Sequence, residues 1–92
     1  MAISEQQIDN GVFRVTKWTI EPNDEIPMHV HEFEYVVVPL VNEVMHVLNS
    51  DHSETPAEIR IGQSYTRRAG GEHAVANHGI NPIEFIEIEK VL

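Results

Sequence analysis

Two histidines separated by one residue stand at the head of the most apolar stretch of the chain. His29 and His31 lie in the segment PMHVHEFEYVVVPL, residues 27–40, and Glu34 follows close behind them. Side chains alternate between the two faces of a β-strand, so both imidazoles would point the same way, about 7 Å apart. That separation allows both imidazoles to reach one metal ion.

Glu34 has the opposite parity from the two histidines. On a regular strand its carboxylate would face away from them, and Tyr35 would face the histidine side. A β-bulge at Glu32–Phe33 would insert one residue, reverse the parity and turn Glu34 toward the ion. We favour the bulge, because a ligating carboxylate would help to neutralise a divalent ion in a desolvated site. The regular strand remains the alternative, and it would leave a site of histidines alone.

Short apolar or alternating segments, separated by turn residues, indicate an all-β protein. No segment has a sustained apolar period of 3.6 residues, as a helix would require. Several short strands with evenly spaced turns are typical of a small antiparallel sandwich or barrel. We expect residues 1–10 to form a loose N-terminal arm and residues 11–92 to form a single domain. The expected strands cover residues 12–20, 28–38, 43–48, 57–61, 64–68, 73–78 and 82–92.

Length and charge exclude several classes of function. The chain has 92 residues, 15 acidic against 6 basic, and a formal net charge of −9. Nucleic acid and anionic membranes are therefore poor partners. The chain has no cysteine, so disulfides and thiolate chemistry are absent. No signal peptide is visible, and the longest apolar run, residues 35–41, is too short to cross a bilayer, so we expect a cytoplasmic protein.

A second motif lies in the other half of the chain, in the segment GQSYTRRAGGEHAVAN that begins at Gly62. Its spacing resembles the second signature of the cupin superfamily at Gly62, Gly70, His73 and Asn77. Arg68 stands where that signature usually has a proline. Four matches at fixed spacing are a far more specific signal than one pair of histidines.

Further segments extend the resemblance over most of the chain. Residues 27–40 resemble the first cupin signature, although Glu34 comes one residue early and the closing glycine is missing near Asn42. The phrases DNGVFRVTKW, YVVVPL and FIEIE resemble a subgroup of short bacterial cupins that includes a protein named for β-alanine degradation. The resemblance implies a small antiparallel β-barrel with a jelly-roll topology.

The resemblance also implies a metal site. It makes His29, His31 and His73 ligands of one divalent ion, with Glu34 as a fourth ligand. Neutral imidazoles and a carboxylate suit iron, manganese, nickel, copper or zinc, and the sequence does not choose among them.

Three more residues are candidates for binding a substrate. Arg67 and Arg68 form the only pair of adjacent basic residues in an acidic chain, and arginine binds carboxylate or phosphate groups in a bidentate manner. The alternative for both is a solvated strand end. Tyr35 is expected to pack in the core, with a polar role only if its hydroxyl is buried. The remaining histidines are expected at the surface: His46, His52 and His78.

Two classes of function follow. The first is a metal-dependent enzyme that oxygenates, isomerises or hydrolyses a small polar or anionic metabolite. The second is a non-catalytic module that binds or senses a small ligand and whose metal is structural or absent. We also expect a homodimer, because exposed strand edges need covering. The strand that carries Val12, Phe13 and Val15 is the expected dimer edge.

Overall fold

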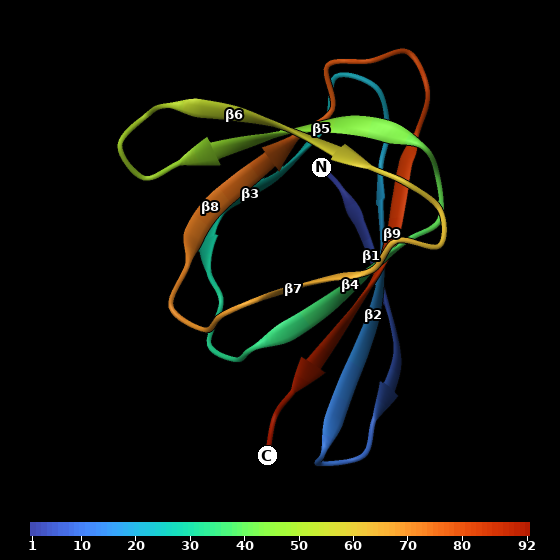
Figure 1. Ribbon diagram of the computed structural model, residues 1–92, viewed down its shortest axis with the longest axis vertical. Coiled ribbons are helices and arrows are strands. Elements are labelled where there is room, and N and C mark those ends of the chain that lie inside the picture. Colours follow the sequence, from blue (N-terminus) through green and yellow to red (C-terminus); the bar gives the residue numbers. More distant parts are fainter.

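The structure is a computed structural model that describes residues 1–92. It contains nine β-strands and no helix, hence no helix that could cross a membrane. Figure 1 shows the strands arranged in two layers. The strands are β1 (Ile3–Asp9), β2 (Phe13–Ile20), β3 (Glu25–Val30), β4 (Tyr35–Pro39), β5 (Glu43–Asn49), β6 (Glu54–Ile59), β7 (Tyr65–Arg67), β8 (Glu72–Ala76) and β9 (Ile83–Lys90).

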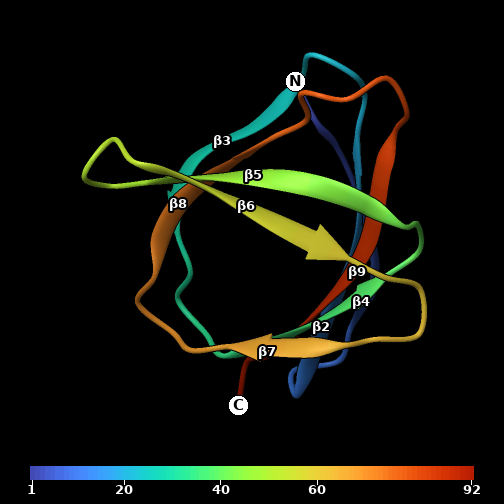
Figure 2. The same ribbon diagram turned by 45° about the horizontal axis from the view of Figure 1, so that its top comes forward.

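The strands form two antiparallel sheets that face each other. One sheet has the order β1-β2-β9-β4-β7 and the other has the order β3-β8-β5-β6. From β3 onward most connections carry the chain from one sheet to the other, and Figure 2 shows the two sheets as opposite walls. This is the jelly-roll arrangement that the sequence predicted, and the all-β fold class is confirmed. The sheets are not hydrogen-bonded to each other into a closed barrel.

The space between the sheets is apolar at one end and polar at the other. Ile20 pairs with Ile83 across β2 and β9, and both side chains are fully buried. Ile26 pairs with Val75 across β3 and β8 at the same end. Further along the same strands the inward positions are taken by histidine and glutamate instead. The apolar end is the hydrophobic core, and the polar end contains the candidate functional residues.

The expected strand over residues 28–38 is two strands in different sheets. β3 ends at Val30 in one sheet, and β4 begins at Tyr35 in the other. Residues 31–34 carry the chain between the sheets, so no single strand can run through them. The prediction of one central strand was wrong, because apolar residues on both sides of the crossing look continuous in the sequence.

A β-bulge does occur near the histidines, but before them rather than after them. Along β3 the step from Ile26 to His29 takes three residues, whereas the paired step on β8, from Val75 to His73, takes two. The extra residue lies at Pro27–Met28 and reverses the parity of the strand. Ile26 and His29 therefore both face the interior, although one has an even and the other an odd number.

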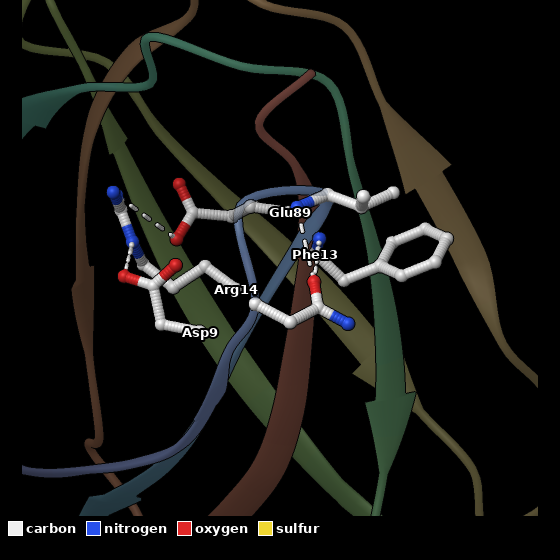
Figure 3. Close-up of polar contacts among 6 residues, drawn as sticks. Asp9, Phe13, Arg14 and Glu89 are labelled. Carbon is white, nitrogen blue, oxygen red and sulfur yellow. Dashed lines mark hydrogen bonds and ion pairs between the residues drawn. The ribbon is translucent and has the colours of Figure 1, made fainter.

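The N-terminal residues are not a loose arm. Ile3–Asp9 pairs with β2 along its length, with one irregularity between Gln6 and Ile8. At the hairpin turn the Nε atom of Arg14 lies 3.6 Å from Asp9 Oδ2, and its Nη1 lies 3.9 Å from Glu89 Oε1 on β9 (Figure 3). The prediction of an arm was wrong. This strand is exposed on both faces and contains few apolar residues, so it lacks the apolar alternation by which a strand is recognised in a sequence.

This strand also changes the expected dimer edge. β2 lies inside its sheet, between β1 and β9, so it cannot pair with a second copy of the chain. The free edge beside β2 is β1, where Ile3 and Ile8 are exposed. Dimerisation stays a prediction, and β1 replaces β2 as the edge that it would use.

Asn77 ties the two turns at the apolar end together. Its side chain is 1% exposed, and its Nδ2 donates hydrogen bonds to the carbonyls of Ile20 at 2.8 Å and Asn81 at 2.9 Å. Its Oδ1 accepts a hydrogen bond from the backbone N–H of Gly79 at 2.9 Å. The asparagine of the second motif therefore has a structural role. Gly70 of the same motif has φ of +92°, a conformation that favours glycine.

We expect Asn77→Ala to lower the free energy of unfolding by about 3 kcal/mol, because buried carbonyls and an amide lose their partners. The measurement is urea unfolding of the variant against the wild type. Asn42→Ala is the control, since the Asn42 side chain accepts a single hydrogen bond from Ile61 in an exposed loop. A loss no larger than that of the control would contradict the structural role.

Candidate metal centre and the adjoining cavity

Three imidazoles converge at the polar end of the interior. The Nε2 atom of His31 lies 2.9 Å from Nε2 of His29 and 3.1 Å from Nε2 of His73. These are the three histidines that the two sequence motifs contain, and they come from β3, the segment after it, and β8. The structure therefore brings together residues that are 42 positions apart in the chain.

Each imidazole is held by a feature of the local backbone. His29 and His73 are direct partners in the antiparallel pairing of β3 and β8. The N–H of His31 donates to the Gly71 carbonyl at 3.0 Å, and the His31 carbonyl accepts from Gly70 at 2.7 Å, so the ladder continues past the end of β3. The ring of Tyr35 stacks on that of His31 with centroids 4.0 Å apart, which fixes the orientation of the His31 ring.

The donor set fits a divalent ion. Imidazole nitrogens bound at about 2.1 Å to one ion, at right angles to each other, lie about 3 Å apart, as these do. His29 Nδ1 lies 2.7 Å from the Pro27 carbonyl oxygen. Because a carbonyl oxygen can only accept a hydrogen bond, Nδ1 must carry the hydrogen. The neutral ring then presents a lone pair at Nε2 toward the other histidines, the tautomer that a metal ligand needs.

Burial favours the neutral form of His31 and His73. Burial lowers the pKa of His31 to about 4, with further contributions from His29 and His73. The pKa of His73 is also lowered, first by burial and then by His29 and Arg67. These neutral rings are available to bind a cation at neutral pH, because no proton has to be displaced from them.

Glu34 does not join the three histidines. Its side chain is exposed, and the group whose ligand atoms lie within 4.8 Å of one another contains only His29, His31 and His73. Parity is kept from His31 to Tyr35, which is buried. The expected bulge at Glu32–Phe33 was wrong: Tyr35 faces inward, as in the alternative, but residues 31–34 cross between the sheets and do not form a regular strand.

A cavity of about 490 Å³ opens beside the histidines, between the sheets. That volume is within the range of small-molecule sites in proteins. His73 lines it, so the cluster reaches the cavity wall. The other polar groups in its wall include Tyr35, Tyr65, Arg67 and Glu87, and apolar side chains such as Val37 and Phe85 fill much of the rest.

Glu87 is the functional candidate that the sequence reasoning missed. It is 9% exposed and occupies an inward position of β9 in line with Ile83 and Phe85. It also borders a smaller hollow on the side of His29 and His31. The segment FIEIEK suggests that isoleucines face inward, but the parity set by Ile83 and Phe85 places the glutamate there. That parity was the signal available in the sequence.

Burial also controls the charge of the other cavity groups. It raises the pKa of Glu87 to about 7, with a further contribution from Glu89. Burial raises the pKa of Tyr35 well above its usual range, and neighbouring Glu87 adds to this, while burial also raises the pKa of Tyr65. Both phenols therefore remain protonated, and Glu87 can hold or release a proton near neutral pH.

The two arginines differ in their placement. Arg67 is in the cavity wall, with its guanidinium carbon 4.6 Å from the centre of the Tyr65 ring and its Nη1 donating to the Thr66 carbonyl at 3.1 Å. Arg68 is exposed and lines neither hollow. Of the two sequence candidates, only Arg67 faces the site.

Comparisons with known proteins agree with this architecture, although no family model matches the chain. The chain is 36% identical over 88 residues to the β-alanine degradation protein BauB of Pseudomonas aeruginosa, covering 96% of this chain and 92% of that protein. A crystal structure of a cupin domain from Bordetella pertussis is 36% identical, with a TM-score of 0.92 and coverage of 97% and 92%. The polyketide cyclase RemF of Streptomyces resistomycificus shares the fold, with a TM-score of 0.78 at 20% identity over 99% of this chain and 66% of RemF. The chain belongs to the cupin family, as a small cupin similar to BauB.

Proposed function

We propose that the protein is a metal-dependent enzyme that acts on a small anionic metabolite bound in the cavity. The observation that carries the proposal is the convergence of three Nε2 atoms at the wall of a cavity that also contains a cation, Arg67, and a titratable acid, Glu87. His29, His31 and His73 would hold the ion. A divalent ion bound there would supply Lewis-acid chemistry suited to isomerisation or hydrolysis, and a redox-active ion would also suit oxygenation.

The residues of the cavity take separate parts in this proposal. Arg67 binds a carboxylate of the metabolite at the rim of the cavity, where the residue is exposed. Glu87 takes up or gives a proton, since its pKa of about 7 leaves both forms populated at neutral pH. Tyr35 and Tyr65 offer neutral hydroxyl groups that donate hydrogen bonds and exclude water.

The name of the relative is consistent with this class of substrate. BauB is named for the degradation of β-alanine, which carries a carboxylate and an amine. A guanidinium and a buried acid in one cavity suit a metabolite with both groups. A binding module without catalysis is the second candidate. Glu87 favours the enzyme, because its pKa of about 7 suits proton transfer near neutral pH, which binding alone does not require.

Replacing a ligating histidine should remove one equivalent of metal per chain. We expect His31→Ala and His73→Ala to lose the ion, and with it about 2.7 kcal/mol of stabilisation at a free metal concentration a hundredfold above the dissociation constant. The measurements are elemental analysis of protein purified without an affinity tag, and thermal unfolding with added metal.

Two variants serve as controls for this experiment. His52→Asn changes an exposed histidine with φ of +69°, a conformation that asparagine tolerates. Glu34→Gln removes the carboxylate that lies outside the cluster. We expect metal affinity within about twofold of the wild type for both, whereas His31→Ala and His73→Ala should lose the interior ion. Metal content equal to the wild type in both histidine variants would reject the site.

Glu87→Gln should change how stability depends on pH in the metal-free protein. Because the folded-state pKa of about 7 exceeds the ordinary value of 4.5, the folded wild type holds its proton while the unfolded chain ionises. The wild type therefore loses stability as pH rises from 4.5 through 7. The amide lacks this penalty, so the variant should gain about 2 kcal/mol relative to wild type between pH 5 and pH 8. Urea unfolding at both pH values measures it, and Glu34→Gln is the control. A flat difference would mean that Glu87 titrates normally.

Arg67→Gln should weaken the binding of small carboxylates about tenfold, because it removes a charge-assisted hydrogen-bonding group. Calorimetric titration of the metal-loaded protein with β-alanine measures the affinity. Arg68→Gln is the matched control, since it removes the same charge outside the cavity. Equal effects of the two substitutions would point to general electrostatic attraction and not to a carboxylate contact.

A further inference from the structure

A second group of metal-binding side chains lies outside the interior, on the outer face of the sheet β3-β8-β5-β6. It contains His46 of β5, Glu54 at the start of β6 and His78 after β8. Its neighbours Met45 and Val47 on β5 line the cavity, so His46, with the opposite parity, faces away from it. The group is therefore separated from the three interior histidines by the thickness of a sheet.

The three side chains meet although they come from separate strands. The Nε2 atom of His78 lies 2.7 Å from Glu54 Oε1, and the rings of His46 and His78 are tilted against each other with centroids 4.6 Å apart. One ligand atom from each residue lies within 4.8 Å of the others. His46 lies on the central strand of the three, opposite Pro56 of β6 and opposite Ala76 of β8, so Glu54 and His78 are each two residues from a direct partner of His46. Glu54 and His78 come from the two sides of β5 and meet over it through their side chains.

An ion pair between His78 and Glu54 does not satisfy the hydrogen-bonding capacity of His46. A protonated His78 beside Glu54 would satisfy those two residues, but Nδ1 of His46 is buried and has no hydrogen-bond partner. A buried polar atom without a partner lowers stability by about 1–3 kcal/mol. Together, the imidazole that lacks a partner, the second imidazole and the carboxylate form a donor set that suits a cation.

We propose that His46, Glu54 and His78 bind a second divalent transition-metal ion. Two imidazoles and one carboxylate match the ligand preference of zinc, and also suit copper, nickel and cobalt, whereas calcium and magnesium prefer oxygen ligands throughout. The formal net charge of −9 on the chain favours binding of a cation at its surface.

The position of the group indicates what the ion does. β6 is an edge strand of its sheet and pairs on one side only, with β5. An ion bound by Glu54, His46 and His78 would tie this edge to the middle of the sheet and to the segment after β8. Thr55 and Ala57 of β6 line the cavity, so the ion would hold that wall of the cavity in place without contacting a ligand inside it.

The test separates the two sites by removing the first. The double variant His31→Ala/His73→Ala, without an affinity tag, is titrated with zinc ions by calorimetry, and thermal unfolding is followed with and without zinc. We expect one zinc ion per chain in this background and a higher thermal midpoint when zinc is present. Adding Glu54→Gln or His78→Ala should weaken zinc binding at least tenfold. Glu58→Gln is the matched control, because Glu58 is an exposed glutamate of the same strand that pairs with Arg60.

A parallel measurement keeps the proposal testable if the double variant does not fold. The wild-type chain should bind two zinc ions, and the single variant His78→Ala should bind one. No zinc binding in the folded background, or binding that is unchanged by His46→Ala, Glu54→Gln and His78→Ala, would overturn the second site. Neither result would bear on the interior histidines, whose loss of metal is measured separately with His31→Ala and His73→Ala.

Discussion

The pairing of β3 with β8 is the constraint on which the site depends. The extra residue at Pro27–Met28 lets Ile26 reach the core and His29 reach His73 from the same strand. Without it, alternation would force one of them outward. The bulge also places the Pro27 carbonyl 2.7 Å from His29 Nδ1, so one backbone irregularity sets both the direction and the tautomer of a ligand.

The interior is divided along the strands into a part that stabilises the fold and a part that is suited to chemistry. At the apolar end, isoleucines pack and Asn77 joins two turns through three side-chain hydrogen bonds. At the polar end, burial shifts the pKa values of His31, Tyr35 and Glu87 away from those in water, in each case toward the neutral form. Such groups lower stability where they stand, and the packed end offsets that loss.

Alternation along a strand gives the sheet β3-β8-β5-β6 two faces with histidines. The inner face presents His29 and His73 to the cavity, while the outer face presents His46 toward Glu54 and His78. The two groups differ in composition: the inner group consists of three partly or fully buried imidazoles, and the outer group includes an exposed carboxylate. Two ions bound to opposite faces of one sheet would affect the same wall of the cavity, one from inside and one from outside.

The sequence by itself determined the all-β class, because local alternation carries that information, and the resemblance of its two motifs to cupin signatures implied the jelly roll and the three histidines. It did not determine which face a residue takes once a bulge or a crossing intervenes, so Glu34 was expected inside and Glu87 was overlooked. The strand β1 was missed because it is held by its pairing with β2, whereas its own mostly polar composition does not indicate a strand. Strand register and the meeting of His46, Glu54 and His78 were decided only by the tertiary structure, since they depend on pairings between residues far apart in the chain.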